Sequence, residues 1–403
     1  MAEVRVGVVG TGFIASNFLN DLGPHREFRV ARVLTRRALE EVGLPPEMLT
    51  NSPDDLLSNC DVIVECSGDP IWATDIVAAA VEARRPVVTM NTEFHITTGS
   101  AFVGSGLITE AEGDQPGCLA SLHEDAVSMG FTPVAYGNMK GFLNPNPTEP
   151  EMRYWAAKQG ISLPMVTSFT DGTKVQAEQI LVANHVGATI AQEGMLGRTV
   201  DSLEEASKVL VEAYERVGQP ISDFVVSPSF PHGVFLIATH ASARPETLEY
   251  YKLGSGPYYT IVRNNIFVHL EIMKTVRRML EGGDVLLHNS SIPKTSLGAI
   301  TKRDLRAGTR LSEAIGSFDL RGHAIHMDDH PDHVPIGLLR NSVVTKDLAA
   351  GSLVRVDAVE LEDSLAVRLW KEGKTSPTSS TEEVGPIRAP DSLSEDDARS
   401  PRA

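Results

Sequence analysis

The sequence predicts an α/β protein: a doubly wound parallel-sheet domain comes first, followed by an α+β domain and a small β-rich domain. Three observations predict this order. The 403-residue chain is too long for one ordinary core. Residues 4–90 alternate short β-branched runs with helical patterns, and a short motif near residue 301 is echoed near residue 345. The expected domains are residues 1–132, 133–290 and 291–371, before an acidic tail, residues 372–403, that is expected to be disordered.

A glycine-containing turn follows the first β-branched run. Residues 4–9 have the pattern of a buried strand, and apolar positions after Gly12 recur at helical spacing. The turn Gly10-x-Gly12-x-x-Ala15 fits the dinucleotide-binding fingerprint, in which the glycines permit a tight turn and close approach to a pyrophosphate. The following helix N-terminus offers free N–H groups to phosphates. We expect a Rossmann domain, with a purely structural turn as the alternative, whose cofactor contacts include Gly10, Thr11, Gly12, Phe13 and Ile14.

The end of the second predicted strand, residues 28–34, bears on cofactor choice. Sites that prefer NAD usually place an acidic residue there to bind the ribose 2′-hydroxyl. This chain has Thr35, Arg36 and Arg37 instead. Because a guanidinium pair suits a 2′-phosphate, we expect NADP(H). NAD(H) binding, or two solvent-exposed arginines without a role, are the alternatives.

Two further predicted strands, residues 61–65 and 86–90, carry small and polar residues just past their ends. Ligands bind outside the carboxyl ends of strands in open parallel sheets. We therefore expect cofactor contacts from Ser67, Gly68 and Asn91. Glu93 is a catalytic candidate, or else an ordinary carboxylate at the start of a helix.

Composition excludes several classes of protein. A formal net charge of −17 argues against nucleic acid and acidic membrane surfaces as partners. No apolar run approaches the length of a membrane span. Because the first predicted strand begins at residue 4, we expect no signal peptide. The three cysteines form no disulfide framework. We expect a cytoplasmic protein that acts on a small-molecule substrate.

Several segments carry a resemblance to a known family. The fingerprint, Glu-x-Ser-Gly at residues 65–68 and Val-x-Met-Asn-Thr-Glu at residues 88–93 resemble the cofactor half of homoserine dehydrogenases. Residues 113–117, 167–174 and 254–259 resemble the homoserine-dehydrogenase-like proteins that end in a SAF domain, which include the Brucella-type deoxyxylulose-phosphate reductoisomerase-like enzymes. The resemblance extends to about Trp370. It implies an NAD(P)-dependent oxidoreductase, a C-terminal SAF (β-clip) fold, and a homodimer or homotetramer.

The catalytic candidates lie at a predicted strand-to-helix junction. Residues 167–170 are strand-like and residues 175–186 have a helical pattern, so Asp171 and Lys174 occupy the junction. Asp171 suits a helix N-cap, which is its structural alternative. A lysine in the first helical turn opposes the helix dipole and so needs an anionic or reacting partner. In homoserine dehydrogenases an Asp/Lys pair serves hydride transfer, so the resemblance implies that Asp171 and Lys174 are the proton-transfer pair. Such a lysine would need a lowered pKa to act as an acid near neutrality.

Other polar residues are weaker candidates. Lys140 lies in a Gly/Pro/Asn-rich loop and could bind a substrate anion, or simply be solvated. Asp114, Gln115, Thr173 and Asn184 are candidates for substrate binding, although Asp114 also suits a structural turn. For Asn184 a role as a packed or capping polar residue is the favoured alternative. Residues 323–333 contain enough histidine and aspartate for a metal site, but their polar composition favours a loop. We expect no metal at that segment, and the sequence does not indicate a divalent metal elsewhere.

The function expected from these residues is NADP(H)-dependent hydride transfer to or from a small polar carbonyl or hydroxyl compound, phosphorylated compounds included. A reductoisomerase of the deoxyxylulose-phosphate type, or a redox-neutral enzyme that uses the cofactor, is the alternative within enzymes. A dinucleotide-binding sensor or scaffold without catalysis is the alternative outside them.

Overall fold

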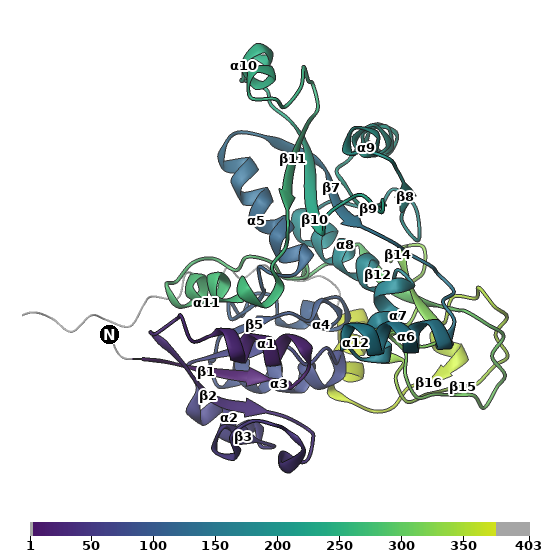
Figure 1. The fold of residues 1–403 in the computed structure, drawn as a ribbon. Coiled ribbons are helices and arrows are strands. Elements are labelled where there is room, and N and C mark those ends of the chain that lie inside the picture. The colour runs from purple at the N-terminus through teal and green to yellow at the C-terminus, as the bar shows by residue number, and fades with distance from the viewer. Residues whose placement is uncertain (1–2, 376–403) are drawn as a thin grey trace, which may run out of the picture.

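The computed structural model describes residues 3–375. A parallel α/β domain (purple) is followed by a mixed-sheet domain (teal to green) and a β-rich C-terminal domain (yellow), as Figure 1 shows. Side chains of the C-terminal domain share one buried apolar cluster with side chains of both other domains. None of the helices within residues 3–375 is long and apolar enough to cross a membrane.

The N-terminal sheet has the strand order β3-β2-β1-β4-β5-β6, and every neighbouring pair is parallel. The strands are β1 (Val4–Val9), β2 (Phe28–Leu34), β3 (Leu49–Thr50), β4 (Val62–Glu65), β5 (Val87–Thr89) and β6 (Ile108–Glu110). Strand order reverses between β1 and β4, and the ligand crevice of such sheets lies at this switch point. The predicted Rossmann-like architecture of the first domain is confirmed.

Helices cover both faces of this sheet: α1 (Phe13–Asp21), α2 (Pro53–Asn59), α3 (Pro70–Glu82) and α4 (Thr92–Thr97). Helix α11 (Ile272–Leu280) returns from much later in the chain, and its buried Ile272, Met273 and Val276 pack in the same apolar cluster as Val6 and Val8. The first domain is therefore completed by residues from within the predicted range 133–290.

The second domain is built on a five-stranded mixed sheet in the order β11-β10-β7-β9-β8. Its strands are β7 (Thr132–Lys140), β8 (Arg198–Thr199), β9 (Ile221–Val226), β10 (Gly233–Thr239) and β11 (Tyr259–Asn264). Its helices are α5 (Gln115–Ser128), α6 (Glu149–Gln159), α7 (Leu163–Thr170), α8 (Thr173–Val186), α9 (Leu203–Val217) and α10 (Pro245–Tyr250). The predicted helix over residues 175–186 is thus confirmed as part of α8, which is almost completely buried.

The predicted strand at residues 167–170 is wrong, because these residues end helix α7. Ser162 caps this helix by accepting a hydrogen bond from Met165 N, and Pro164 sits in its first turn. The hydroxyls of Thr167 and Thr170 donate to backbone carbonyls one turn earlier. Local capping and back-bonding therefore override the β preference of this run.

The C-terminal domain has two small antiparallel sheets, β12-β14 and β13-β15-β16. Its elements are β12 (Thr295–Thr301), β13 (Arg310–Leu311), β14 (Leu320–His326), β15 (Ser342–Val344), β16 (Val359–Glu360), the short 3₁₀ turn η5 (Ile336–Leu338) and helix α12 (Leu365–Thr375). The two copies of the sequence repeat pair through reciprocal backbone hydrogen bonds between Leu305 and Leu348. This domain is β-rich as predicted, and its assignment as a SAF fold stays a prediction.

Two expectations for this domain need correction. The histidine-rich segment is not simply a loop, because His323 and His326 lie on strand β14. The tail does not begin at residue 372, because residues 372–375 continue helix α12. There the Lys374 ammonium donates to the carbonyls of Pro331 and His333, so this end of the helix is held to the domain. The remainder of the predicted tail, residues 376–403, lies outside the described residues.

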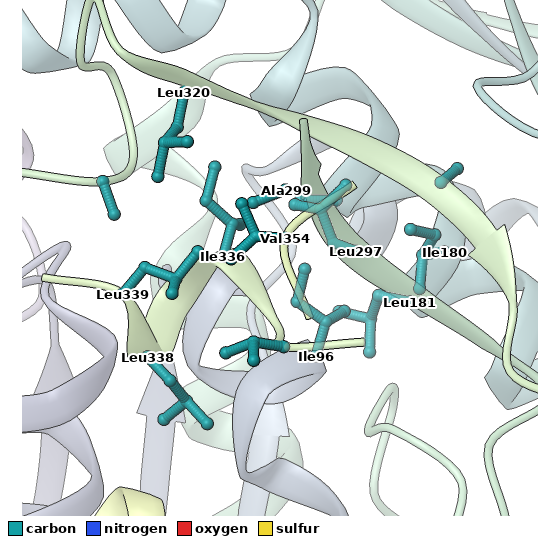
Figure 2. Close-up of a cluster of buried hydrophobic side chains, with 14 of the residues drawn as sticks. Ile96, Ile180, Leu181, Leu297, Ala299, Leu320, Ile336, Leu338, Leu339 and Val354 are labelled. Atoms are coloured by element: carbon teal, nitrogen blue, oxygen red, sulfur yellow. The ribbon is translucent and has the colours of Figure 1, made fainter. Parts of the chain in front are cut away.

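Helix α8 is where the second and third domains meet. Figure 2 shows Ile180 and Leu181 of α8 in one buried cluster with Leu297 and Ala299 of β12, and with Ile96 of α4. Each of the α8 and β12 side chains in this cluster is at most 1% exposed. The position of α8 is therefore fixed by apolar packing from both neighbouring domains, which matters for the polar groups at its N-terminus.

Candidate active site

The glycine turn has room for a dinucleotide. Gly10 adopts a positive φ of 106°, and a Cβ at this position would lie 2.9 Å from the Cys66 carbonyl oxygen. A Cβ at Gly12 would meet nothing within 4 Å, so the backbone faces open space there. Helix α1 has no side-chain cap at its N-terminus, which leaves its first N–H groups available to an anion. These residues fit a pyrophosphate.

One cavity of about 1700 Å³ runs from this turn to the N-terminus of α8. Most of the sequence-predicted site residues line it: Gly10, Thr11, Gly12, Phe13, Ile14, Thr35, Arg36, Arg37, Ser67, Gly68, Glu93, Asp114, Gln115, Lys140 and Lys174. The cavity thus contains most of the predicted cofactor residues and most of the predicted catalytic residues.

Arginines gather at one end of the cavity. The Arg36 guanidinium donates a 2.7 Å hydrogen bond to Asp69 Oδ2 and lies 4.5 Å from the centre of the Trp72 ring. Arg37 is exposed beside it. Asp69 was not considered in the sequence analysis, because it follows β4 and not β2. A carboxylate therefore does reach this corner, although none stands at the tip of β2.

Lys174 lies at the other end, where the N-termini of three helices converge. Its ammonium donates to Asp114 Oδ2 at 3.0 Å, to Thr92 Oγ1 at 3.2 Å and to Glu93 Oε2 at 3.3 Å. Asp114 is the N-cap of α5, whereas Thr92 and Glu93 begin α4. The unfavourable position of Lys174 at a helix start is thus offset by two carboxylates, and its three donors are all used.

The charge on Lys174 is firmly held. Burial disfavours the ammonium, but the carboxylates of Asp114, Glu93 and Glu178 outweigh burial and raise the pKa of Lys174 well above its usual value. Lys174 therefore lacks the lowered pKa that an acid near neutrality would need. For Asp114, burial acts to raise its pKa, but the Lys174 ammonium prevails and the pKa is lowered. The pair is a buried ammonium–carboxylate contact.

Lys140 has a partner of its own in Glu178, which the sequence analysis missed. Lys140 Nζ donates to Glu178 Oε2 at 2.9 Å, and Asn138 Nδ2 donates to the same oxygen at 2.8 Å. The side-chain amide of Gln115 finds partners for both its atoms when its oxygen and nitrogen are exchanged. In that orientation the nitrogen donates to Asp114 and Glu178, and the oxygen accepts from Lys140. Lys140 is thus not simply a solvated lysine. Glu178 follows Lys174 by one helical turn, and that spacing was the available signal.

Asp171 is not the partner of Lys174. Its Oδ2 accepts a 2.7 Å hydrogen bond from Lys302 of the C-terminal domain, and its Oδ1 accepts from Thr173 N. Burial raises the pKa of Asp171, and Lys302 acts against this rise. Asp171 ends α7, and Gly172, with a φ of 85°, turns the chain into α8. The carboxylates that contact Lys174 are therefore those of Asp114 and Glu93, and the role of Asp171 and Lys174 as a proton-transfer pair stays a prediction.

Three other candidates hold the structure together instead of lining the cavity. Asn91 is fully buried and caps α4 by accepting from Phe94 N. Thr173 Oγ1 accepts from Gly322 N of β14. Asn184 donates to the Thr295 carbonyl and accepts from the Thr295 N–H, so it ties α8 to β12. Among the described residues, the wall of the cavity includes none of the three, and their contacts to cofactor or substrate stay predictions.

A second buried pair lies behind Thr92. His95 Nε2 lies 3.4 Å from Glu110 Oε2, and both side chains are at most 1% exposed. Burial, with His288 and His185 adding to it, lowers the pKa of His95 to about 3. Burial, followed by the Asp114 charge, raises the pKa of Glu110 well above its usual value. His95 is therefore neutral near pH 7, and Thr92 Oγ1 connects Glu110 to Asp114.

Within residues 3–375, no group of three or more His, Cys, Asp or Glu side chains is arranged to hold a metal ion. In the histidine-rich segment, His333 instead bonds to Ser296 Oγ and the His330 carbonyl. Cys60 and Cys118 are buried and Cys66 lines the cavity, all three as free thiols.

Comparison with known families matches residues 113–272 to the oxidoreductase DRL, catalytic domain. The matched segment carries four residues of the polar end of the cavity: Asp114, Lys140, Lys174 and Glu178. Together with the parallel sheet and glycine turn of the first domain, this match makes the chain an NAD(P)-dependent oxidoreductase. A comparison with curated protein sequences gives no match.

Solved structures of dehydrogenases align with much of the chain at low similarity. A homoserine dehydrogenase from Thiobacillus denitrificans aligns at 14% identity and a TM-score of 0.43, over 77% of this chain and 84% of its own. A UDP-N-acetylglucosamine 3-dehydrogenase from Acidithiobacillus ferrooxidans aligns at 12% identity and 0.40, over 72% and 92%. A myo-inositol dehydrogenase from Corynebacterium glutamicum aligns at 14% identity and 0.35, over 65% and 75%. These likenesses do not assign a substrate.

Proposed function

We propose that the chain is an NADP(H)-dependent oxidoreductase that transfers hydride between the cofactor and a small polar carbonyl or hydroxyl compound, phosphorylated compounds included. The observation that carries the proposal is the single cavity with the glycine turn and the arginines at one end and the Lys174 cluster at the other. Bound there, the nicotinamide would supply or accept the hydride. The chain's own residues must hold the cofactor, orient the substrate and manage the proton on its oxygen.

The pyrophosphate end of the cofactor is assigned to the glycine turn. Gly12 leaves space for close approach, and the free N–H groups at the start of α1 offer donors to the phosphates. The Arg36 and Arg37 guanidiniums line the cavity beyond the tip of β2, where the adenosine ribose of such cofactors lies. Charge-assisted hydrogen bonds from these groups favour a 2′-phosphate, which supports NADP(H) over NAD(H).

Lys174 is assigned to the substrate oxygen. Its three donors are occupied, and its longest hydrogen bond is the 3.3 Å contact to Glu93, which lines the cavity while Thr92 does not. A substrate oxygen would therefore replace Glu93, leaving Asp114 and Thr92 to hold the ammonium in place. The fixed positive charge then stabilises the negative charge that develops on the oxygen during carbonyl reduction.

The raised pKa of Lys174 is compatible with proton donation, because an alkoxide is a far stronger base than an amine. It is less compatible with Lys174 acting as a base near neutrality, because a neutral amine would be rare. We therefore propose that Lys174 acts as the proton donor when the carbonyl is reduced. Lys140, which is held by Glu178 on the same wall, is assigned to a second oxygen or an anionic group of the substrate.

The test is a screen of NADPH oxidation and NADP⁺ reduction against phosphorylated sugars, polyols and homoserine, with product analysis that detects isomerisation without net redox change. We expect at least one class to turn over with wild type and not with Lys174→Met. Tight NADPH binding without turnover of any class would favour the sensor or scaffold alternative. A product that is both rearranged and reduced would favour the reductoisomerase alternative.

A further inference from the structure

The C-terminal domain reaches the arginine end of the cavity through Arg340. This residue follows η5, whose Ile336 and Leu338 are each 1% exposed in the cluster of Figure 2. A Cβ at Gly337 would lie 2.2 Å from Thr97 Oγ1, so η5 also packs tightly against α4 of the first domain. The backbone before Arg340 is therefore fixed against the cofactor-binding half.

Arg340 and Arg36 share one carboxylate. Both guanidiniums donate 2.7 Å hydrogen bonds to Asp69 Oδ2, although Arg340 is 271 residues away in the sequence. Asp69 Oδ1 accepts from Ile71 N and Trp72 N at the start of α3. A carboxylate has about four acceptor sites, and these four donors occupy them. Asp69 therefore has no acceptor left for a ribose hydroxyl, and its role is to aim the two arginines.

Both guanidiniums keep donors for a ligand. Each has five N–H groups, and the hydrogen bonds to Asp69 use only Nη1 of each guanidinium, so N–H groups remain for a ligand. Arg340 Nε is buried and has no hydrogen-bond acceptor among the described residues. The Glu313 carboxylate lies 3.6 Å from that nitrogen, beyond hydrogen-bond distance. Arg36, Arg37, Asp69, Glu313 and Arg340 all line the cavity, and three positive against two negative charges leave this corner net positive. A phosphate monoester, with a charge near −1.5 to −2 at pH 7, suits such a corner.

We infer that Arg340 is a third arginine of the 2′-phosphate subsite, supplied by the C-terminal domain, so that this domain takes part in cofactor selection. The inference rests on the proposed use of NADP(H). It gives the C-terminal domain a direct role in recognition besides its packing against α8. A 2′-phosphate would accept hydrogen bonds from both Arg36 and Arg340, while Asp69 holds the two guanidiniums in position.

The test uses calorimetric titration of the full chain with NADPH, NADH and 2′-AMP, without any substrate. Arg340→Met keeps the apolar stem and removes the guanidinium. We expect it to weaken NADPH and 2′-AMP binding about tenfold and to leave NADH within about twofold. Arg340→Lys retains the positive charge and can still donate to Asp69, so its NADPH affinity should lie between those of wild type and Arg340→Met. If Arg340→Met folds poorly, Arg340→Lys still tests the inference. Arg306→Ala, which removes an exposed ion pair with Asp347 in the same domain, is the control and should change nothing.

Equal weakening of NADPH and NADH by Arg340→Met would overturn the inference, because it would show a purely structural role for the Arg340–Asp69 contact. Unchanged affinity for all three ligands would overturn it as well. If wild type does not prefer NADPH at all, the proposed cofactor fails together with the inference. If wild type prefers NADPH and only Arg36 and Arg37 substitutions affect the preference, the inference alone fails.

Discussion

The two ends of the cavity hold their charges in opposite ways. The Lys174 side chain is 11% exposed and uses all three donors on neighbouring side chains, whereas the Arg36 side chain is 52% exposed and shares a single carboxylate with Arg340. Burial and saturation keep the lysine charged and fixed before any ligand arrives, which suits stabilisation of a developing negative charge. Exposed guanidiniums with spare donors suit recognition of a charged group that arrives from solvent. One cavity thus combines an end at Lys174, where the charge is fixed before a ligand binds, with an end at Arg36, where donors remain for an incoming anion.

The largest expected effect comes from removing the charge at the buried end. Lys174→Met should lower turnover by roughly 100-fold or more, because the substrate oxygen loses its proton donor and its charge stabilisation. NADPH affinity should stay within about threefold, because the pyrophosphate is assigned to the distant glycine turn. Steady-state turnover and a separate NADPH titration separate the two roles, with the exposed Lys208→Met as the control. Turnover near wild type would reject Lys174, and collapsed NADPH binding with normal folding would make it a cofactor ligand.

The complementary change is made at the arginine end of the cavity. Replacing Arg36 and Arg37 together by alanine should erase the preference for NADPH over NADH, at a cost of roughly 2–4 kcal/mol for NADPH, since two sets of charge-assisted hydrogen bonds are lost. Calorimetry with both cofactors measures the preference, and turnover at saturating NADPH should change far less than in Lys174→Met. If wild type binds NADH as tightly as NADPH, the interpretation of this end is wrong.

A third prediction concerns the buried pair behind Lys174. The folded state holds His95 with a pKa of about 3, below its value of about 6.5 in an unfolded chain, so the unfolded state binds more protons between these pH values. The contribution of His95 to the free energy of unfolding is fully present above pH 6.5. It decreases as the pH drops toward 3, by about 3 kcal/mol at pH 4. Denaturant unfolding of wild type and His95→Gln at pH 7 and pH 4 measures this. The variant should lose less stability on acidification, and an identical loss would show that His95 does not carry the effect.

The smallest expected effect lies at neither end of the cavity. Removing residues 376–403, which are rich in Ser, Pro, Glu and Asp, should leave the melting temperature and NADPH affinity unchanged, because this composition offers little apolar surface to bury. Differential scanning calorimetry of the shortened chain tests this. A fall of several degrees would mean that the segment packs on the body of the protein.

The glycine turn, the strands around it and helix α8 could be predicted from the sequence, because their signals are local. Gly10 and Gly12 follow a β-branched run directly, and the apolar spacing of α8 is contained within the helix itself. Lys174 was found for the same reason: a lysine at a helix start is visible without any tertiary information.

The partners of these residues could not be predicted, because they come from far along the chain. Asp114 is 60 residues from Lys174, Lys302 is 131 residues from Asp171, and Arg340 is 271 residues from Asp69. The pairing of Asp171 with Lys174 was implied by the family resemblance, but the two side chains bind different partners in the structure. Gly172 turns the chain between them, and only the packing of the C-terminal domain supplies Asp171 with its true partner.

The central claim is that the arginine end and the Lys174 end belong to one cofactor-and-substrate site. A crystal structure of the full chain with bound NADP⁺ tests it most directly. The account predicts the pyrophosphate at the glycine turn, the 2′-phosphate in hydrogen-bond contact with Arg36 and Arg340, and the nicotinamide facing Lys174 inside the cavity. A nicotinamide outside the cavity, or a 2′-phosphate without arginine contacts, would contradict it.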